Sequence, residues 1–282
     1  MTDAPRIVLS DLAFPEGPRW RDGELYFSAM HSHEVVAMTP AGARRTVLRH
    51  NGPVSGLGWL PDGRMLVVSM LDRKLLRQEK DGSVAEHGDM SKLALHNTND
   101  MVVDAEGRAY VGNFGFSFPD GEMKSTIMVR VDPDGSVREV ADDLMFPNGA
   151  VITPDGRTLI VGESFGGRLT AYDIAPDGSL TNRRVWAQLE GGAVPDGISL
   201  DAEGAIWVAS PPTKEALRVH EGGKVSQRVT SEQEVFACML GGPERRTLYL
   251  LTANSSDPVQ TAAERKGRIE AVEVAVPGAG RP

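Results

Sequence analysis

A pattern of three short strands recurs along this chain, and this repeat limits the possible folds more than any other feature. The clearest copy runs over residues 146–180, FPNGAVITPDGRTLIVGESFGGRLTAYDIAPDGSL. Two apolar runs and one alternating run are separated by a Pro-Asp-Gly turn and a Gly-Gly turn, which is typical of antiparallel strands in a meander. The same succession returns from Ser55 as SGLGWLPDGRMLVVSMLDRKLLRQEKDG. The chain is therefore predicted to be built from repeated β units.

The spacing of the copies predicts a β-propeller. Further copies begin at Glu16, Asn99 and Asp196 and near Phe236, so that successive copies lie about 39 to 49 residues apart. Propeller blades of four short strands have repeats of roughly 40 to 50 residues. The 282 residues accommodate six such blades, and no seventh copy is found. Short stretches between copies, such as RTVLRHNG and RRVWAQLEG, are predicted to form the outermost strands.

The expected fold is therefore an all-β, six-bladed β-propeller with four antiparallel strands per blade. The segment PRIVLSDL precedes the first copy and is predicted to pair with the last blade, which would close the ring and protect its edges. No linker or low-complexity segment divides the sequence. We therefore expect one domain over residues 1–282, with polar insertions at 113–126 and 254–267 that form surface loops or border the mouth of a site.

Composition excludes several classes of partner. A net charge of −9 and a pI near 5.2 argue against a nucleic-acid surface, which needs clustered basic residues. The beginning of the chain lacks the pattern of a signal peptide, and no apolar run approaches the ~20 residues that span a bilayer. The single cysteine, Cys238, lies in an apolar run and suits a reducing compartment. We expect a cytoplasmic protein with a small-molecule partner, no nucleic acid and no membrane; the oligomeric state is left open.

Polar residues stand at the beginning of most repeats. The innermost strand of each blade lines the central channel, so equivalent lead-in residues are expected to converge at one end of the axis. In chain order these residues are Glu16, Ser55, Asn99 with Asp100, Asn148, Asp196 and a last position close to Cys238. Carboxylate and amide oxygens suit Ca²⁺, Mg²⁺ or Mn²⁺, and Zn²⁺ matches less well. Asn-Gly and Asp-Gly pairs also form turns, but turn chemistry alone does not explain four such residues at one register.

The repeats resemble a known family over nearly the full length of the chain. The motifs that carry the resemblance are FPEGPRW around Glu16, NDMVVDAEGRAYVGNFGF from Asn99, FPNGAVITPDGRTLIVGES around Asn148 and VPDGISLDAEGAIWVAS around Asp196. They are similar to the senescence marker protein (regucalcin), gluconolactonase and luciferin-regenerating enzyme family. The resemblance implies a six-bladed propeller with one divalent ion on its axis, held by Glu16, Asn148 and Asp196. It also implies that Asn99 is a further ligand or a substrate contact, with Asp100 beside it, and that the activity is lactone hydrolysis.

One departure bears on the substrate. Sugar-lactone members of this family often carry an arginine where this chain has Asn97, and an arginine would offer a fork of donors to a polyhydroxylated substrate. Aromatic residues nearby fit a less polar lactone or ester, although ordinary blade packing explains them equally well. These residues are Phe14, Phe114, Phe116, Phe146 and Phe165. The predicted substrate contacts are Asn97, Asn99, Asp100, Phe114, Phe146 and Glu163, and the role of His96 is left open.

The predicted activity is a metal-dependent lactonase that opens a lactone or related small ester by attack of activated water. Asp196 is the candidate general base and Asn99 the candidate donor to the oxyanion. The sequence has no G-x-S-x-G nucleophile elbow that would indicate a covalent mechanism. The alternatives are a non-catalytic calcium- or ligand-binding propeller, and a propeller of the strictosidine-synthase type, whose catalytic residue has no counterpart that we can place here.

Overall fold

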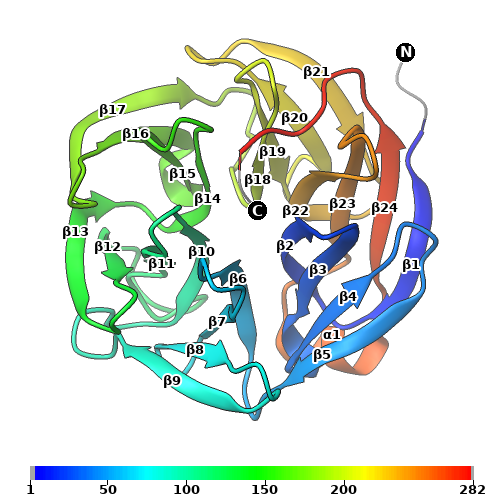
Figure 1. Ribbon diagram of the computed structural model, residues 1–282. Helices are drawn as coiled ribbons and strands as arrows, with labels where there is room; N and C mark the ends of the chain where they lie inside the picture. The colour runs from blue at the N-terminus through cyan, green and yellow to red at the C-terminus, as the bar shows by residue number, and fades with distance from the viewer. Residues whose placement is uncertain (1–3, 281–282) are drawn as a thin grey trace.

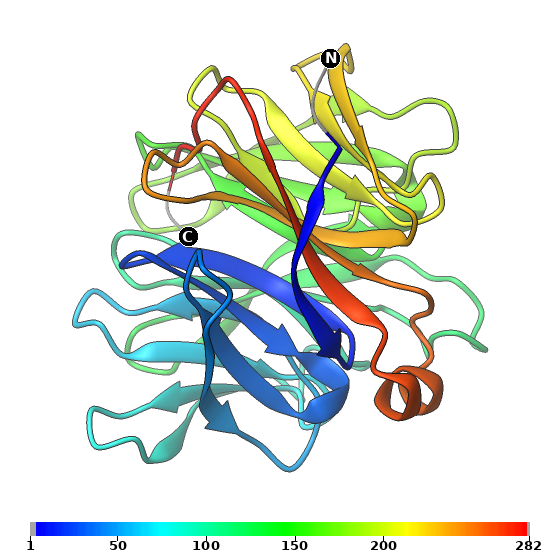
Figure 2. The ribbon, with the colours of Figure 1, turned by 90° about the vertical axis from the view of Figure 1, so that its right-hand side faces the viewer.

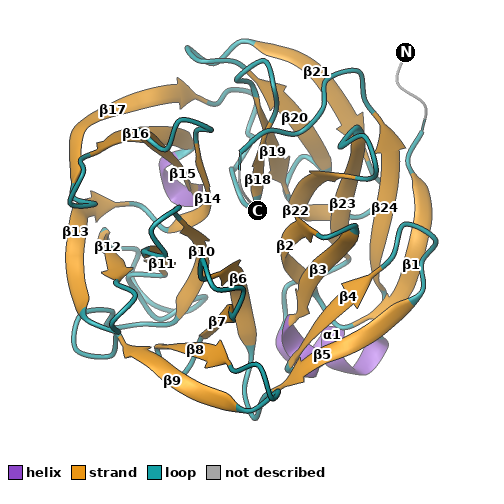
Figure 3. Ribbon diagram, in the orientation of Figure 1, coloured by secondary structure: helices purple, strands orange, loops and turns teal. Residues whose placement is uncertain are grey.

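The computed structural model describes residues 4–280 and contains six four-stranded antiparallel sheets arranged around a central axis. Figure 1 and Figure 3 show the ring along this axis, with each sheet forming one blade. The fold predicted from the repeats is confirmed. Residues 1–3 and 281–282, which the predicted domain includes, lie outside the described part.

The first three blades follow one another along the chain. The first contains β2 (Pro15–Arg21), β3 (Glu24–Ala29), β4 (Glu34–Met38) and β5 (Arg44–Arg49). The second contains β6 (Val54–Trp59), β7 (Met65–Ser69), β8 (Lys74–Gln78) and β9 (Val84–Asp89). The third contains β10 (Thr98–Val103), β11 (Ala109–Asn113), β12 (Thr126–Val131) and β13 (Val137–Leu144).

The last three blades complete the ring. The fourth contains β14 (Pro147–Ile152), β15 (Thr158–Glu163), β16 (Arg168–Ile174) and β17 (Leu180–Gln188). The fifth contains β18 (Ile198–Leu200), β19 (Ile206–Ser210), β20 (Glu215–Val219) and β21 (Val225–Thr230). The sixth contains β22 (Glu234–Gly241), β23 (Thr247–Ala253) and β24 (Gly267–Glu273), with β1 (Arg6–Leu12) as its outermost strand.

Pairing between β1 and β24 closes the ring. Arg6 is opposite Ala271 and Leu12 is opposite Gly267 in this antiparallel pair. Figure 2 shows the two strands side by side, although they come from opposite ends of the chain. The closure covers an edge of the sixth sheet that would otherwise be free to pair. This confirms the role predicted for the segment PRIVLSDL.

The hydrophobic core lies between neighbouring blades. One cluster joins Val151 and Ile160 of the fourth blade to Ile198 and Leu217 of the fifth, and all four side chains are buried. Because each sheet is covered on both faces by its neighbours, its inner strands are apolar runs without clear alternation. Burial of these runs is the main stabilising contribution to the propeller.

Two insertions and two short 3-10 helices lie at the end of the ring where the innermost strands begin. Residues 114–125 form a loop between β11 and β12, and α1 (Pro258–Glu264) lies between β23 and β24. Asp257 caps α1 by accepting a hydrogen bond from Gln260 N at 2.7 Å. The 3-10 helices η1 (Met30–Ser32) and η2 (Ser164–Gly166) follow β3 and β15. Among the described residues, no helix has the length and apolar character needed to cross a membrane.

Candidate metal and substrate site on the propeller axis

β-Bulges direct the lead-in residues of the innermost strands. The register between first and second strands shifts between Glu16 and Arg19 in the first blade, and between Pro147 and Ala150 in the fourth. Similar shifts follow Val54, Thr98 and Val235 in the second, third and sixth blades. A bulge leaves one residue unpaired and re-aims its side chain. The residues at these positions therefore leave the ladder at the same end of the channel.

Close contact between blades explains the glycine that follows several lead-in residues. A Cβ atom on Gly149 would lie 2.6 Å from Ile198 N, and one on Gly197 would lie 2.6 Å from the Cβ of Ala237. Neither glycine has a positive φ, so neither occupies the left-handed turn position. The Asn-Gly and Asp-Gly pairs are thus not turn formers here, and the glycines allow the backbones of adjacent blades to approach.

The sixth lead-in position belongs to Phe236 rather than to Cys238. The N–H of Gly197 donates to Phe236 O at 2.8 Å, in the same way that Gly149 N donates to Asp196 O at 3.2 Å in the preceding blade. Cys238 lies two residues deeper, is 1% exposed and places its Sγ 3.4 Å from Trp207 O. Burial raises the pKa of its thiol. The cysteine therefore remains a protonated, buried side chain, as its apolar run indicates.

Glu16 and Asp196 bring two carboxyl groups close together on the axis. Burial raises the pKa of Glu16 to about 8, against the effect of a 2.7 Å hydrogen bond from Gly17 N. Burial also raises the pKa of Asp196, and the charges of Glu16 and Asp100 add to the shift. Within residues 4–280 no salt bridge reaches either carboxyl group, because Arg19 is bound to Asp100. Two such groups without a basic partner are the kind of environment that a cation stabilises.

A chain of side-chain hydrogen bonds crosses four blades beside these carboxyl groups. Ser55 Oγ donates to Asn99 Oδ1 at 3.2 Å, and Asn99 Nδ2 donates to Asn148 Oδ1 at 3.1 Å. Asn148 Nδ2 then donates to Ser164 Oγ at 3.3 Å, and Ser164 Oγ donates to Pro195 O at 2.8 Å. The chain fixes the orientation of both amides. It links the lead-in residues of the second, third and fourth blades to the residue that precedes Asp196.

A buried ion pair holds Asp100. Arg19 is 4% exposed, and its Nη2 lies 2.9 Å from Asp100 Oδ1 and also donates to Met101 O. Met101 N donates to the same Asp100 oxygen at 2.8 Å. The pair connects the innermost strands of the first and third blades. Asp100 thus lies near the axial carboxyl groups, with Arg19 and a backbone amide both bonded to its Oδ1. Its contact with a substrate stays a prediction.

Glu163 lies apart from the axial side chains. It is 0% exposed, and its carboxylate accepts hydrogen bonds from Arg168 Nε at 2.9 Å and Met145 N at 2.8 Å, and another from Thr170 Oγ1. These donors keep the pKa of Glu163 low despite its burial. These bonds tie Glu163 to its own blade, and its contact with a substrate stays a prediction. Ser164, the next residue, is the one that faces the axis.

Asn97 and His96 border the site from the third blade. Both side chains are half-buried, and Asn97 O accepts a hydrogen bond from Phe114 N at 2.9 Å. This bond sets the first residue of the 114–125 loop beside the strand that carries Asn99. The loop thus lies beside the axial residues. This agrees with the second of the two interpretations of the insertion at 113–126, in which it borders the mouth of a site.

Two polar residues beside the axis are not among the site residues predicted from the sequence. Ser164 follows the second strand of its blade, and Arg19 lies within the innermost strand of the first. The equivalence of Ser164 with Met30, Met70 and Phe114, which follow the second strands of the first three blades, could have indicated a residue at the mouth. No local signal indicates Arg19, because its partner lies 81 residues away.

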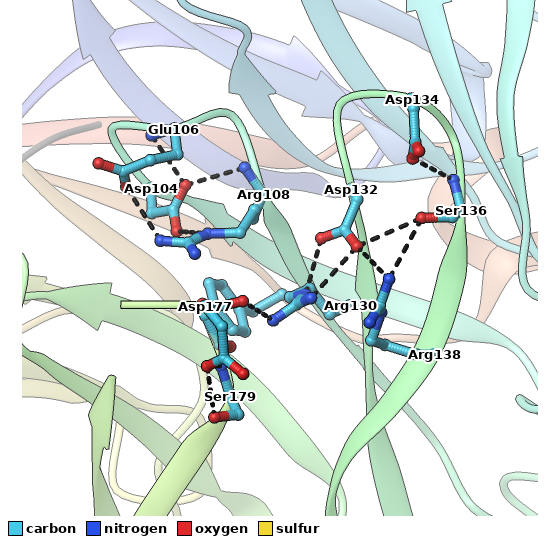
Figure 4. A network of polar contacts seen from close by, with 12 residues as sticks. Asp104, Glu106, Arg108, Arg130, Asp132, Asp134, Ser136, Arg138, Asp177 and Ser179 are labelled. Carbon is cyan, nitrogen blue, oxygen red and sulfur yellow. Dashed lines mark hydrogen bonds and ion pairs between the residues drawn. The ribbon is translucent and has the colours of Figure 1, made fainter. Parts of the chain in front are cut away.

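The opposite end of the ring contains a different polar region. A cleft of about 820 Å³ lies between the third and fourth blades and is lined by turn residues that include Asp104, Arg108 and Asp155. Figure 4 shows that the charges here pair with one another, including Arg108 Nε with Asp104 Oδ2 at 2.6 Å and Arg130 Nε with Asp132 Oδ1 at 2.8 Å. No lead-in residue lines this cleft. We therefore place the candidate site at the axial end that carries Glu16, Asn148 and Asp196.

The fold and the axial side chains together define a class: a six-bladed propeller with carboxylate and amide oxygens gathered at one end of its channel. The family model described as the SMP-30/gluconolactonase/LRE-like region matches residues 14–254. The chain belongs to this family, as the sequence motifs predicted.

Individual relatives are distant but extend over most of the chain. The chain is similar to the regucalcin of Xenopus laevis, with 26% identity over 88% of this chain and 85% of the relative. It is 28% identical to the 6-deoxy-6-sulfogluconolactonase of Pseudomonas putida, over 98% of this chain and 96% of the relative. Among solved structures, a calcium-binding protein, regucalcin, from Agrobacterium tumefaciens matches with a TM-score of 0.82 at 22% identity, over 99% of this chain and 96% of that one. The last comparison supports the fold.

Proposed function

We propose that this protein is a divalent-metal-dependent hydrolase that opens a lactone or a related small ester at the axial end of its propeller. Lactonase relatives and the family itself support lactone hydrolysis in general. The observation that carries the finer proposal is the pair of buried carboxyl groups, Glu16 and Asp196, whose pKa values are both raised and which have no basic partner in the described chain.

The donor set fits a hard cation. Within the described residues, no three His, Cys, Asp or Glu side chains gather as a metal site, so a cation would need an amide oxygen beside Glu16 and Asp196. Asn148 would supply this oxygen: its side chain lies within hydrogen-bonding reach of Asp196, and its Oδ1 accepts a hydrogen bond from Asn99 Nδ2 at 3.1 Å. Carboxylate and amide oxygens are the ligands of Ca²⁺, Mg²⁺ and Mn²⁺, and Zn²⁺ is a weaker match. A bound divalent ion would supply positive charge that polarises a carbonyl and makes a water more acidic.

The side chains then have separate roles in the proposed reaction. Asp196, once deprotonated, accepts a proton from the attacking water as the new C–O bond forms. The bond from the carbonyl carbon to the ring oxygen breaks, and Asp196 returns the proton to the leaving alkoxide. The side-chain amide of Asn99 donates one N–H to Asn148 Oδ1 and has a second N–H that can donate to the developing oxyanion. The product of lactone opening is a single hydroxy acid, and water is the only co-reactant required.

A lactonase assay with metal control tests this proposal. Purified protein is treated with a chelator, dialysed, and assayed on a panel of sugar, aliphatic and aromatic lactones with and without added Mn²⁺, Ca²⁺, Mg²⁺ or Zn²⁺. We expect activity to disappear in the metal-free protein and to return with at least one cation. Cation binding without turnover on any lactone would contradict the hydrolase and favour the non-catalytic binding propeller. Full turnover in the metal-free protein would contradict the metal dependence.

A further inference from the structure

Phenylalanines are concentrated at the axial mouth. The chain has eight, and seven of them belong to a connected group at this end: Phe14, Phe114, Phe116, Phe118, Phe146, Phe165 and Phe236. The eighth, Phe27, packs in a core cluster between blades. We call the seven residues the aromatic mouth. A general need for blade packing does not explain this distribution, since the core clusters between blades take their aromatic side chains from tryptophan and tyrosine, with Phe27 as the exception.

The aromatic mouth is joined directly to the proposed metal ligands. Phe14 and Phe146 each lie two residues before a ligand, Glu16 and Asn148, and have φ values of 57° and 60°. A positive φ is rare for a bulky residue. In both blades this backbone conformation turns an aromatic ring to the mouth immediately before the strand that carries the ligand. The aromatic rings of Phe14 and Phe146 are therefore directly adjacent to the proposed metal ligands.

Ring contacts make the surface continuous. Phe146 stacks on Phe114 with centroids 4.4 Å apart and meets the edge of Phe165 at 5.0 Å. On the other side, Phe14 contacts Phe236 at 4.7 Å, and both share an apolar cluster with Met30 and Met70, against which Phe114 packs. The polar end of Asn113 secures the loop, since its Nδ2 donates to Ile127 O at 2.8 Å. The surface is thus held in place by residues of the first, third, fourth and sixth blades.

Part of this surface remains open to solvent. Phe118 is 43% exposed and Phe165 is 39% exposed, whereas Phe116 and Phe146 beneath them are buried. Met123, in the same loop as Phe118, is 51% exposed. Exposed apolar side chains grouped beside a polar site are typical of a ligand-binding surface. Water would be released from these rings if an apolar group of a ligand covered them.

Three arginines and one histidine near the mouth are already engaged within the protein. Arg19 binds Asp100, Arg168 binds Glu163, and Arg73 Nη1 donates to Ala94 O at 3.3 Å. His31 stacks on Phe14 at 4.8 Å, its Nδ1 lies 2.5 Å from Thr261 Oγ1, and burial lowers its pKa to about 4, so it is neutral. These four side chains would therefore offer few free donors to a polyhydroxylated or anionic substituent. An apolar substituent would not need them.

From this geometry we propose that the aromatic mouth binds an apolar or aromatic group of the ligand, and that the substrate is a lactone or cyclic ester bearing such a group. The carbonyl would lie at the axial oxygens and the apolar part against Phe165, Phe118 and Phe146. This inference rests on the proposed hydrolase function and adds the class of substrate to it.

A matched pair of lactones and a matched pair of variants test the inference. The substrates are 3,4-dihydrocoumarin, a lactone fused to a benzene ring, and glucono-1,5-lactone, a sugar lactone. The variants are Phe165→Ala, at the open surface, and Val185→Ala, a control at a 56% exposed apolar residue of the outer strand β17. We expect kcat/KM for dihydrocoumarin to exceed that for gluconolactone. Phe165→Ala should raise KM for dihydrocoumarin about tenfold, leave gluconolactone kinetics within about twofold, and Val185→Ala should change neither.

A binding measurement separates this inference from the proposed chemistry. The lactam 3,4-dihydroquinolin-2-one has the shape of dihydrocoumarin but resists hydrolysis, and its binding can be followed by saturation-transfer NMR in metal-free protein. Binding that weakens in Phe165→Ala but not in Val185→Ala would support the aromatic mouth. Such binding without turnover of either lactone would contradict the hydrolase alone. Preference for gluconolactone, with no effect of Phe165→Ala on lactam binding, would overturn the inference and leave the hydrolase in place.

Discussion

Asn99 Nδ2 donates a hydrogen bond to Asn148 Oδ1 across 3.1 Å, joining the innermost strands of two neighbouring blades. The amides begin equivalent strands of the repeat and are 49 residues apart in sequence. Through this bond the proposed oxyanion donor is oriented by a proposed metal ligand. Substitutions at the two positions should therefore have separable effects.

Replacing Asn99 should impair the chemical step more than metal binding. In Asn99→Ala the donor to the oxyanion is lost, and we expect kcat to fall roughly 10²-fold, while the affinity for the cation falls by only about tenfold. Lactonase kinetics at saturating metal and calorimetric titration of the cation measure the two quantities. Asn182→Ala, at an exposed amide of the outer strand β17, is the control. An unchanged kcat in Asn99→Ala would remove this residue from the mechanism.

Cation binding should release protons near neutral pH. Because the pKa of Glu16 is raised to about 8, this carboxyl group is largely protonated at pH 7 and must lose its proton to become a ligand. The apparent affinity for the cation should therefore rise as the pH increases from 6 to about 8. Calorimetry in buffers of different ionisation enthalpy counts the protons released. The number of protons released should be lower in Glu16→Gln. An equal number in both proteins would contradict the assignment of the released proton to Glu16.

The same shift predicts how the metal-free protein responds to pH. A carboxyl group whose pKa is higher in the folded state than in the unfolded state stabilises the fold most below the unfolded value, near 4.5, and loses this contribution as the pH rises through about 8. We expect the Tm of metal-free protein to fall by roughly 5 °C between pH 5 and pH 8.5. Thermal scans with and without a saturating cation measure this. A fall of the same size in saturating cation or in Glu16→Gln would assign the effect to other groups.

The buried pair of Arg19 and Asp100 should be required for stability as a unit. In Arg19→Met the Asp100 carboxylate would be left without its partner beside Glu16 and Asp196, and the free energy of unfolding should fall by about 3 to 5 kcal/mol. The double variant Arg19→Met/Asp100→Asn removes the charge as well and should recover at least half of this loss. Urea denaturation of the two single variants and the double variant completes the cycle. Additive losses would show that the pair is not coupled.

The sequence contained enough information for the architecture because the repeat carries its own turns. Each Pro-Asp-Gly or equivalent turn marks the end of an innermost strand, so blade number, strand order and ring closure could be predicted from spacing. The convergence of Glu16, Asn148 and Asp196 followed from their shared register. Their role as metal ligands and the single-domain assignment stay predictions.

Other features could not be predicted because they depend on contacts between blades. The β-bulges that re-aim Glu16 and Asn148 change the strand register without a local sequence signal. Glu163 and Ser164 are adjacent polar residues at the end of a strand, and only the fold decides that the serine faces the axis. The phenylalanines were compatible with either blade packing or a substrate surface, and the exposure of Phe118 and Phe165 supports the second.

The most direct test of the central claim is a crystal structure of protein soaked in Mn²⁺, with anomalous diffraction to locate the ion. We predict one strong anomalous peak on the propeller axis, within roughly 2.0 to 2.6 Å of oxygen atoms of Glu16, Asn148 and Asp196, and the loss of this peak together with lactonase activity in Asp196→Asn. An axis without a peak in protein that hydrolyses lactones, or a fully active Asp196→Asn variant, would contradict the account.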